Sequence, residues 1–374
     1  MKSFNIGRIS GIEIELHSTF VLFIAFIVLL LALFDPINLI GSITLIVFLF
    51  TSVFFHELTH SMVSIKKGIK VKKIILLPIG GMALTENFPE KPIDEFLISV
   101  AGPLFNFAVV IVLVFIVSLL DFIPFPTQTE ITGNINSALM NYPVFALMYV
   151  NLMLGTFNLL VPALPLDGGR VWRSLLSLKF GKTKATAFVA KISKLVALIL
   201  FIAGIFSGGI LLSVIAVFIY FASKYENDLQ QMKDVLDGID VKKITSKKIP
   251  LLKKNLSLKE LFDLMEKENR FSFLLKQKNA LKYIDLELMK KVKKGNWAEI
   301  KAFDASAEMH VIPDEAKAEK AMELFMATNY ELIAVQKKGK ISGVIERKEM
   351  QKLFEIAKAK KENSGRKQPA KAKN

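Results

Sequence analysis

Apolar residues fill most of the first 222 positions in long runs that contain almost no charge. A run of about 20 such residues is typical of a helix that crosses the hydrocarbon core of a membrane. Short segments with charge, proline or paired glycine separate the runs. We therefore expect a polytopic α-helical membrane domain over residues 1–223, with six transmembrane helices at roughly 17–34, 39–65, 96–120, 143–166, 188–206 and 210–222.

A β-rich segment interrupts this pattern after the second expected helix. Residues 71–77 favour a strand, Pro78-Ile-Gly-Gly81 favours a turn, and residues 82–85 complete a small hairpin. The segment is too apolar for an ordinary loop and too short to span, so we expect a small membrane-associated β hairpin; a surface hairpin is the alternative. Residues 12–16 alternate in polarity and predict either a strand or a segment that leads into the first helix.

The chain becomes polar after residue 223, where lysine and glutamate are frequent and long apolar runs stop. We expect a linker over 224–240. Segments 241–292 and 301–354 share a layout of loop, helix, two short strands and helix. This predicts two weak repeats that pack as one α/β domain over 241–356.

Local signals place the elements of this domain. Ser257 and Glu260 have the spacing of a capping box at the start of an amphipathic helix. Residues 314–327 predict a second amphipathic helix, and residues 333–345 predict a hairpin around a Lys-Lys-Gly-Lys turn. Residues 357–374 are rich in lysine and alanine without apolar periodicity, so we expect a basic disordered tail.

The composition agrees with a membrane protein that carries a polar domain. The 374 residues are 52% hydrophobic, and the mean hydropathy of +0.43 is high for a soluble protein. The net charge is +15, but lysine and arginine in a membrane protein first report topology, so we expect no specific nucleic-acid partner. The chain has no cysteine, which excludes disulfides and thiolate metal ligands.

Basic residues mark one side of the expected membrane domain. The loops after the second and fourth helices, and the chain from Lys224 onward, are basic, whereas the other three loops contain no lysine or arginine. The positive-inside rule then predicts a multi-pass protein of the cell membrane with both termini and the α/β domain in the cytoplasm. The first apolar run lacks a small-residue cleavage site, so no cleavable signal peptide is evident.

His56-Glu-Leu-Thr-His60 lies near the end of the second expected helix. Positions i and i+4 share one helix face, so the two imidazoles can hold one metal ion, and Glu57 beside them can deprotonate a bound water. The motif is specific because the chain contains only four histidines. The alternative is a helix whose histidines are satisfied by ordinary hydrogen bonds.

A catalytic zinc site needs a third protein ligand and an open position for water. The candidates are His17, His310 or a carboxylate. His17 opens the first expected helix and His310 belongs to the polar domain. Asp167 is the better candidate, since it ends the fourth helix on the same side as the histidines, and Gly168-Gly169 permits a tight turn there.

Such a site, with one zinc per chain, predicts peptide-bond hydrolysis with Glu57 as the proton carrier. Asn158 and Asn106 are candidates to stabilise the oxyanion or orient the substrate; helix–helix hydrogen bonds are the alternative for both. A helical substrate must be unwound before cleavage, and the hairpin at 70–86 can hold an extended segment by strand addition.

Four motifs occur in an order that resembles the site-2 protease family of intramembrane zinc metalloproteases. They are His56-Glu-Leu-Thr-His60, Pro78-Ile-Gly-Gly81, Ala101-Gly-Pro-Leu-Phe-Asn106 and Phe157-Asn-Leu-Leu-Val-Pro-Ala-Leu-Pro-Leu-Asp-Gly-Gly-Arg170. The resemblance covers roughly residues 5–222, and the polar domain resembles the CBS-domain pair of the prokaryotic branch.

The resemblance implies zinc held by His56, His60 and Asp167, Glu57 as the base, and a transmembrane protein substrate cleaved in regulated intramembrane proteolysis. One departure is Val161, which intervenes between Asn158-Leu-Leu160 and Pro162 and turns Asn158 by about 100° relative to Asp167.

CBS pairs bind adenine nucleotides in other proteins. Here Glu346 and Glu349 stand where a Ser/Thr and an Asp usually hold ribose and phosphate, so the nucleotide-binding residues are unknown. The sequence leaves a homodimer open.

Two other function classes remain at this stage. A transporter or channel regulated by CBS domains could use intramembrane histidine and aspartate in an ion path. An inactive scaffold with a sensory domain is the second. The intact His-Glu-x-x-His and Asp-Gly-Gly motifs disfavour both.

Overall fold

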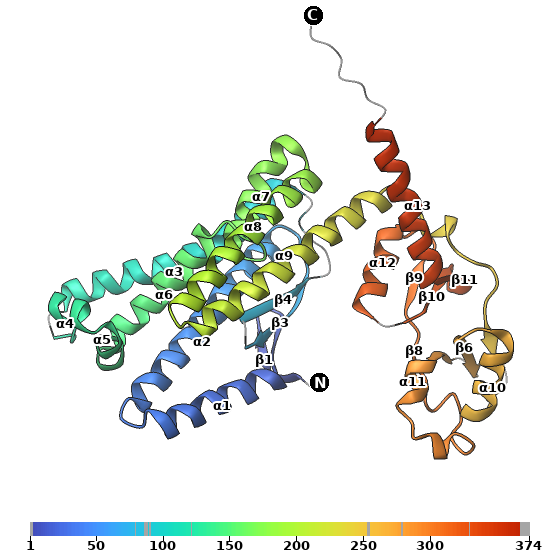
Figure 1. The fold of residues 1–374 in the computed structure, drawn as a ribbon, viewed down its shortest axis with the longest axis horizontal. Coiled ribbons are helices and arrows are strands. Elements are labelled where there is room, and N and C mark those ends of the chain that lie inside the picture. Colours follow the sequence, from blue (N-terminus) through green and yellow to red (C-terminus); the bar gives the residue numbers. More distant parts are fainter. Residues whose placement is uncertain are drawn as a thin grey trace, which may run out of the picture. The chain divides into compact units, whose positions relative to one another are not determined.

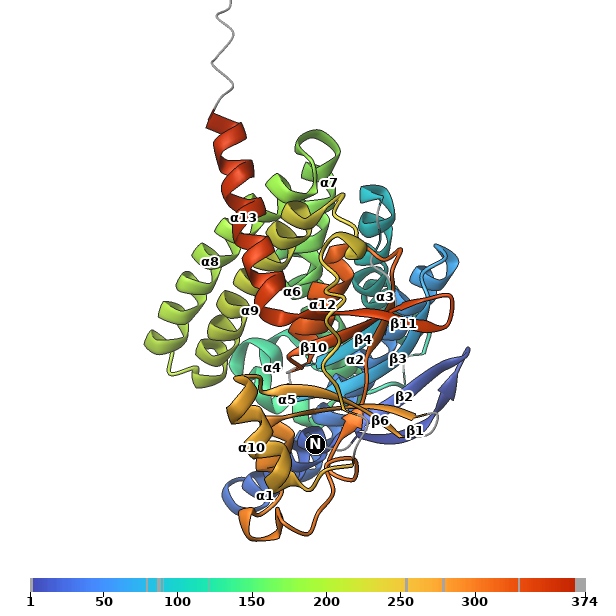
Figure 2. The same cartoon turned by 90° about the vertical axis from the view of Figure 1, so that its right-hand side faces the viewer.

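The computed structural model describes residues 3–366 except 79, 86–88, 90, 121, 253–254, 278–279 and 329. It divides into two compact units, Met1–Gln230 and Gln231–Asn374. Figures 1 and 2 show the ribbon from two sides.

The first unit begins with a four-stranded sheet in the order β1-β2-β3-β4. The strands are β1 (Ser3–Ile9), β2 (Ile12–His17), β3 (Val71–Leu77) and β4 (Gly80–Thr85). The expected hairpin is therefore present, and the alternating stretch at 12–16 is a strand that pairs in parallel with β3. Buried Ile12, Ile14 and Ile74 pack against Leu58 of helix α2, which fixes the sheet beside the His-Glu-x-x-His segment.

Long apolar helices make up most of the rest of this unit. They are α1 (Ser18–Phe34), α2 (Leu39–Lys66), α3 (Pro92–Leu119), α6 (Pro143–Leu160), α8 (Lys182–Phe206) and α9 (Ile210–Leu236). Five are long and apolar enough to cross a membrane, and α1 is a shorter apolar helix of 17 residues. The number of helices that span the membrane therefore stays a prediction.

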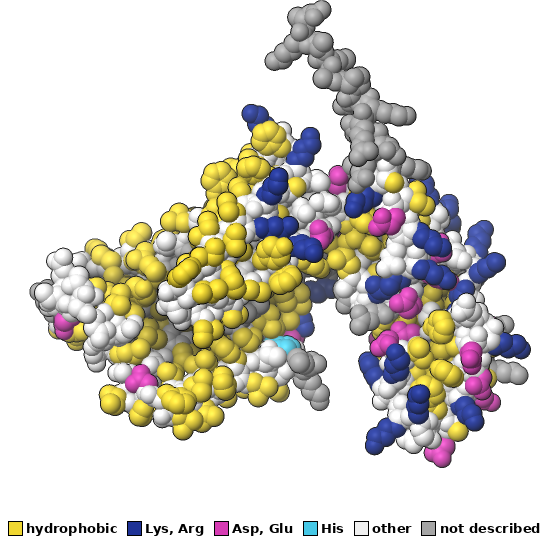
Figure 3. Space-filling view, in the orientation of Figure 1, with side chains coloured by type: hydrophobic (Ala, Val, Ile, Leu, Met, Phe, Trp, Pro, Cys, Tyr) yellow, Lys and Arg dark blue, Asp and Glu magenta, His cyan; other side chains and the backbone are white. Residues whose placement is uncertain are grey.

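The bundle reverses the usual distribution of polarity. Its surface is largely apolar, as the space-filling view shows over the membrane-type helices (Figure 3). Ser52, Asn106, Asn151 and Ser193 are buried instead. Helices α2, α3 and α6 pack against one another in this polar interior (Figures 1 and 2). This arrangement is typical of a bundle that faces lipid.

The structure differs from the sequence prediction around the fourth helix. Helix α6 ends at Leu160 rather than at residue 166, and Asp167 begins a separate helix, α7 (Asp167–Phe180). Pro162 and Pro165 explain the break, because proline lacks an N–H and clashes with the preceding helical turn. The loop before α6 contains two short helices, α4 (Gln128–Gly133) and α5 (Ile135–Asn141).

The second unit contains the two predicted repeats. The first has β5 (Leu251–Leu252), α10 (Leu258–Glu268), β6 (Ser272–Gln277), β7 (Ala280–Asp285) and α11 (Leu286–Lys290). The second has β9 (Val311–Pro313), α12 (Ala318–Ala327), β10 (Leu332–Lys337), β11 (Lys340–Glu346) and α13 (Arg347–Arg366), and β8 (Ala307–Glu308) joins the first sheet. The sheet orders are β5-β6-β7-β8 and β11-β10-β9.

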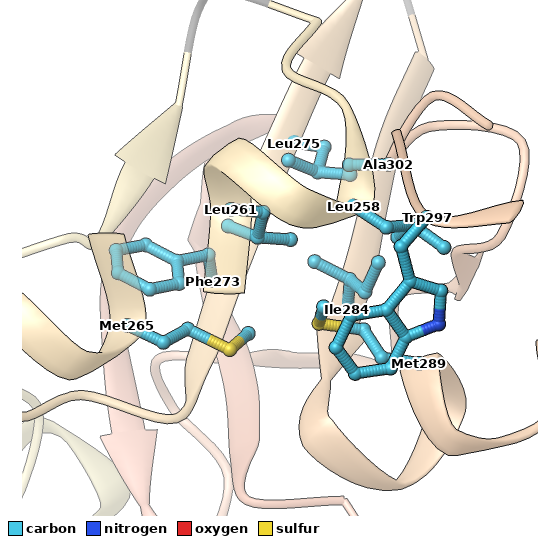
Figure 4. Packing of buried hydrophobic residues seen from close by; sticks show 9 residues of the cluster. All are labelled: Leu258, Leu261, Met265, Phe273, Leu275, Ile284, Met289, Trp297 and Ala302. Atoms are coloured by element: carbon cyan, nitrogen blue, oxygen red, sulfur yellow. The ribbon is translucent and has the colours of Figure 1, made fainter. Parts of the chain in front are cut away.

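Helix α10 packs on its sheet through an apolar core that Figure 4 shows. The predicted capping box is present, with Ser257 accepting from Glu260 N at 3.2 Å and Glu260 accepting from Ser257 N at 2.7 Å. The core residues, drawn as sticks in Figure 4, are Leu258, Leu261, Met265, Phe273, Leu275, Ile284, Met289, Trp297 and Ala302.

Two segments of the polar region are helical where the sequence predicts a linker and the start of a disordered tail. Helix α9 continues to Leu236, so most of the expected linker at 224–240 is helical. Helix α13 continues to Arg366, so the expected disordered tail does not begin at residue 357. Residues 357–366 are rich in lysine and alanine, strong helix formers that extend α13. The end of α9 instead buries Met232 and Leu236. Residues 367–374 lie outside the described residues.

Candidate metal centre

Three buried side chains from distant parts of the chain converge at one point. His56 and His60 project from the same face of α2, and Asp167 is the first residue of α7. The two Nε2 atoms lie 3.1 Å apart, and Asp167 Oδ2 lies 3.1 Å from His56 Nε2 and 3.2 Å from His60 Nε2. The structure therefore brings together the three residues that the sequence predicts as ligands.

The hydrogen bonds behind the rings leave both Nε2 atoms as acceptors. His60 Nδ1 lies 2.6 Å from the backbone oxygen of Ile98, so it must donate its hydrogen there. His56 Nδ1 lies 2.6 Å from Asn106 Oδ1, which accepts in the same way. A neutral imidazole then has a free lone pair on Nε2.

A cation explains why two lone pairs and a carboxylate oxygen face one another. Donor atoms held 2.0–2.1 Å from a tetrahedral zinc lie about 3.3 Å apart, close to the separations of 3.1–3.2 Å among these three atoms. The donor set of two imidazoles and one carboxylate is also that of known catalytic zinc sites, which keep a fourth position for water. The residues present therefore fit zinc.

Gly102 on α3 lets that helix approach the imidazoles closely. A Cβ atom at this position would lie 2.7 Å from His56 Nε2 and nearer still to His60 Nε2. Any other residue would occupy the space between the ligand atoms. Sequence reasoning placed Gly102 only within a motif and did not identify this contact.

Glu57 lies between the two histidines on α2 and faces the hairpin. The backbone of Gly81 on β4 passes so close that a Cβ there would overlap the Cγ atom of Glu57. The candidate base is therefore confined between its own helix and the edge strand of the sheet.

Asp167 is held in position by tight backbone packing at the start of α7 and by a buried ion cluster farther along that helix. Cβ atoms at Gly168 and Gly169 would collide with the backbone of residues 159–164, so these glycines permit close approach rather than a turn. Farther along α7, Arg173 pairs with Glu95 of α3 and, at 2.5 Å, with Glu226 of α9. Sequence reasoning missed this cluster, because its members are far apart in the chain.

The two asparagine candidates have different surroundings. Asn106 is fully buried, with Oδ1 toward His56 and Nδ2 donating to Asn151 Oδ1 at 2.8 Å. Both of its polar atoms have buried partners, as the helix–helix alternative expects, and its oxyanion role stays a prediction. Asn158 donates to Leu154 O at 2.9 Å, one turn earlier in α6.

The other two histidines lie elsewhere, and the described residues contain a single group of side chains suited to a metal. His17 caps α1 by accepting from Thr19 N at 3.3 Å. His310 lies against the Tyr330 ring, with ring centroids 5.0 Å apart. Neither supplies the third ligand.

Comparison with known proteins agrees with this geometry. The family model described as peptidase family M50 matches residues 44–203. A zinc metalloprotease of Methanocaldococcus jannaschii is 38% identical over 272 residues, which cover 72% of this chain and 74% of that protein. The chain belongs to peptidase family M50. It is a membrane-type zinc metalloprotease.

Two solved structures are also similar. The site-2 protease from Methanocaldococcus jannaschii is 39% identical, with a TM-score of 0.46, and the match covers 60% of this protease and 95% of that chain. A CBS-domain containing protein from Agrobacterium tumefaciens is 12% identical, with a TM-score of 0.29, covering 31% of this protease and 96% of that chain.

Proposed function

We propose that the protease hydrolyses a peptide bond in or near a transmembrane segment of a membrane protein. The observation that carries this proposal is the convergence of His56, His60 and Asp167 inside a bundle with an apolar surface. A substrate that reaches this site from lipid must itself be a membrane segment. An inactive scaffold gives no reason for three acceptor atoms to meet within 3.2 Å, and a transporter that binds an ion there gives no role to Glu57.

His56, His60 and Asp167 are the proposed zinc ligands. When bound, zinc supplies Lewis acidity that makes a water acidic enough to attack a peptide carbonyl near neutral pH. Glu57 accepts the proton of that water at its carboxylate and passes it to the leaving nitrogen. The narrow space between α2 and β4 holds the Glu57 carboxylate for both transfers.

Strand β4 is the proposed docking edge for an unwound substrate. It is an edge strand in the sheet order, and its residue Gly81 lies against Glu57. A peptide added to this edge would run beside the candidate base with its backbone extended. Replacing Ile75 of β3 with proline weakens the hairpin and should reduce cleavage of a helical substrate more than cleavage of an extended one. Equal losses would contradict the docking role.

The second unit is proposed to be a cytoplasmic CBS-domain pair, which the repeated helix-and-strand layout supports. The basic loops support the cytoplasmic placement of both termini and a six-helix count. A cavity of about 290 Å³ in this unit is lined by four acidic residues and two basic ones, and this charge balance disfavours binding of a polyphosphate. The charged lining residues are Asp285, Glu287, Glu331, Glu346, Arg270 and Lys348.

The substitution Glu57→Gln tests the proposed function. A glutamine cannot carry the proton, but it leaves the three ligands in place. We expect purified protein to retain about one zinc per chain and to lose cleavage of membrane-protein fragments in cells, measured by proteomic comparison with wild type. Retained cleavage in the variant, or wild-type protein that binds no zinc, would refute the proposal.

A further inference from the structure

A chain of buried hydrogen bonds leads from helix α6 to His56. Asn151 Nδ2 donates to Leu147 O at 2.9 Å and to Ser52 Oγ at 3.0 Å. Asn151 Oδ1 accepts from Asn106 Nδ2 at 2.8 Å. Asn106 Oδ1 in turn lies 2.6 Å from His56 Nδ1. Asn151 and Asn106 are 1% and 0% exposed, so water does not compete for these bonds.

Each hydrogen bond in this series has a fixed donor and acceptor, and the backbone oxygen of Leu147 determines them. A backbone oxygen only accepts, so the amide nitrogen of Asn151 must face it and the amide oxygen must face Asn106. Asn106 then presents its nitrogen to Asn151 and its oxygen to His56. An amide oxygen only accepts as well, so the hydrogen of the neutral His56 ring lies on Nδ1 and the lone pair on Nε2.

We infer that Asn151 is a positioning residue that sets the tautomer of His56 through Asn106. The inference rests on the proposed role of His56 as a zinc ligand. The second histidine shows the contrast: a backbone oxygen, that of Ile98, fixes the tautomer of His60 directly. The Nε2 lone pair of His56 therefore depends on side chains, and a substitution on α6 can change it.

Loss of Asn151 frees the Asn106 amide to rotate. Its NH₂ group can then donate to His56 Nδ1, which moves the ring hydrogen to Nε2, the atom that faces Asp167 at 3.1 Å. A protonated Nε2 cannot bind a metal. Second-layer partners of histidine ligands typically change metal affinity 10- to 100-fold, and we expect a loss of this size.

The experiment measures zinc affinity by chelator competition on the full-length protein in detergent. Asn151→Leu should weaken zinc binding roughly 10- to 100-fold. Asn141→Leu is the matched control, because Asn141 is exposed at the end of α5 and its amide makes the same kind of bond to the fourth residue before it, at 2.9 Å. Its zinc affinity should equal that of wild type. Cobalt-substituted Asn151→Leu should show an altered visible spectrum, which reports a changed ligand field.

Two further variants separate positioning from a general effect on folding. Asn106→Leu combined with Asn151→Leu should bind zinc no more weakly than Asn106→Leu alone, because Asn151 acts only through Asn106. Asn151→Asp retains an oxygen that accepts from Asn106 and, as the neutral acid, a donor toward Leu147. We expect it to recover most of the zinc affinity that Asn151→Leu loses.

His56→Ala distinguishes the two levels of the proposal. If His56→Ala loses zinc while Asn151→Leu binds it like wild type, the positioning role of Asn151 is wrong and the zinc site stands. Additive losses in the double variant would also overturn the positioning role. If His56→Ala binds zinc like wild type, the proposed function itself fails.

Discussion

The backbone of Gly81 on β4 lies directly against the side chain of Glu57 on α2. A Cβ at Gly81 would overlap Glu57 Cγ and would lie 3.3 Å from its Cβ and 3.4 Å from its carboxyl carbon. The edge of the sheet therefore forms one wall of the space that holds the candidate base. This contact couples the expected substrate-docking strand to proton transfer, two features that lie more than 20 residues apart in the sequence.

Gly81→Ala should impair catalysis without removing the metal. The added methyl must displace either Glu57 or strand β4, and a shift of about 1 Å at a catalytic group costs on the order of 100-fold in rate. We expect kcat to fall by about that factor while zinc content stays at the wild-type level. Gly133→Ala is the control, since a Cβ there meets no atom within 4 Å. Wild-type kcat in Gly81→Ala would show that the contact is not functional.

Gly102→Ala should have the opposite signature, a loss of zinc itself. Its methyl would enter the space between His56 Nε2 and His60 Nε2, where α3 cannot retreat without losing its other packing. We expect zinc content well below one per chain, measured by metal analysis after purification, and a corresponding loss of cleavage. If the variant retains full zinc, then Gly102 of α3 does not border the metal position and this assignment is wrong.

Arg173→Met should destabilise the bundle and weaken zinc binding together. The substitution leaves Glu95 and Glu226 without their shared cation, and removing one partner of a buried ion pair costs about 3–5 kcal/mol. Arg173 lies on the helix that begins with Asp167, so the third ligand should become less well placed. Thermal unfolding in detergent and chelator competition provide the two measurements.

The control for Arg173 is an ion pair at the surface. Lys317 pairs with Asp240 at 2.8 Å, with about half of each side chain exposed. Exposed pairs contribute little because solvent screens them, so Lys317→Ala should leave both measurements near the wild-type values. A large effect of Lys317→Ala, or none of Arg173→Met, would contradict this assignment of the buried cluster.

Local sequence patterns predicted the parts of the site that depend on neighbouring residues. The i, i+4 spacing placed His56 and His60 on one helix face, and the absence of cysteine directed the search for a third ligand to a carboxylate, which led to Asp167. The position of Asp167 at a helix end was correct, but it begins α7 instead of ending α6, because two prolines separate the helices.

Contacts between distant helices could not be predicted in this way. The role of Gly102 beside the imidazoles, the Asn151–Asn106 pair and the Glu95–Arg173 ion pair all depend on which helix faces pack together. The helices are apolar nearly all round, so hydrophobic periodicity does not indicate their inward faces. Asparagine and charged residues within such apolar helices predict which positions face the bundle interior, but they do not predict which residues contact one another.

Tyr283 should make the stability of the second unit sensitive to alkali. Its hydroxyl donates to Asp285 and accepts from Glu331 N, both at 2.7 Å, and its ring stacks on Tyr330. Burial, together with the nearby Asp285 carboxylate, raises the pKa of Tyr283 above its ordinary value. The neutral phenol is therefore favoured in the folded state.

The stabilisation from neutral Tyr283 is fully present below the unfolded pKa of about 10 and is lost as pH rises above it. Tyr283→Phe should be less stable than wild type near neutral pH, because two buried hydrogen bonds are lost. Above about pH 10 its stability should fall less steeply than that of wild type. Denaturant unfolding of the full chain at several pH values measures both effects, with Tyr225→Phe, at an exposed tyrosine, as the control. Parallel pH profiles for wild type and Tyr283→Phe would show that the buried phenol does not control the alkaline transition.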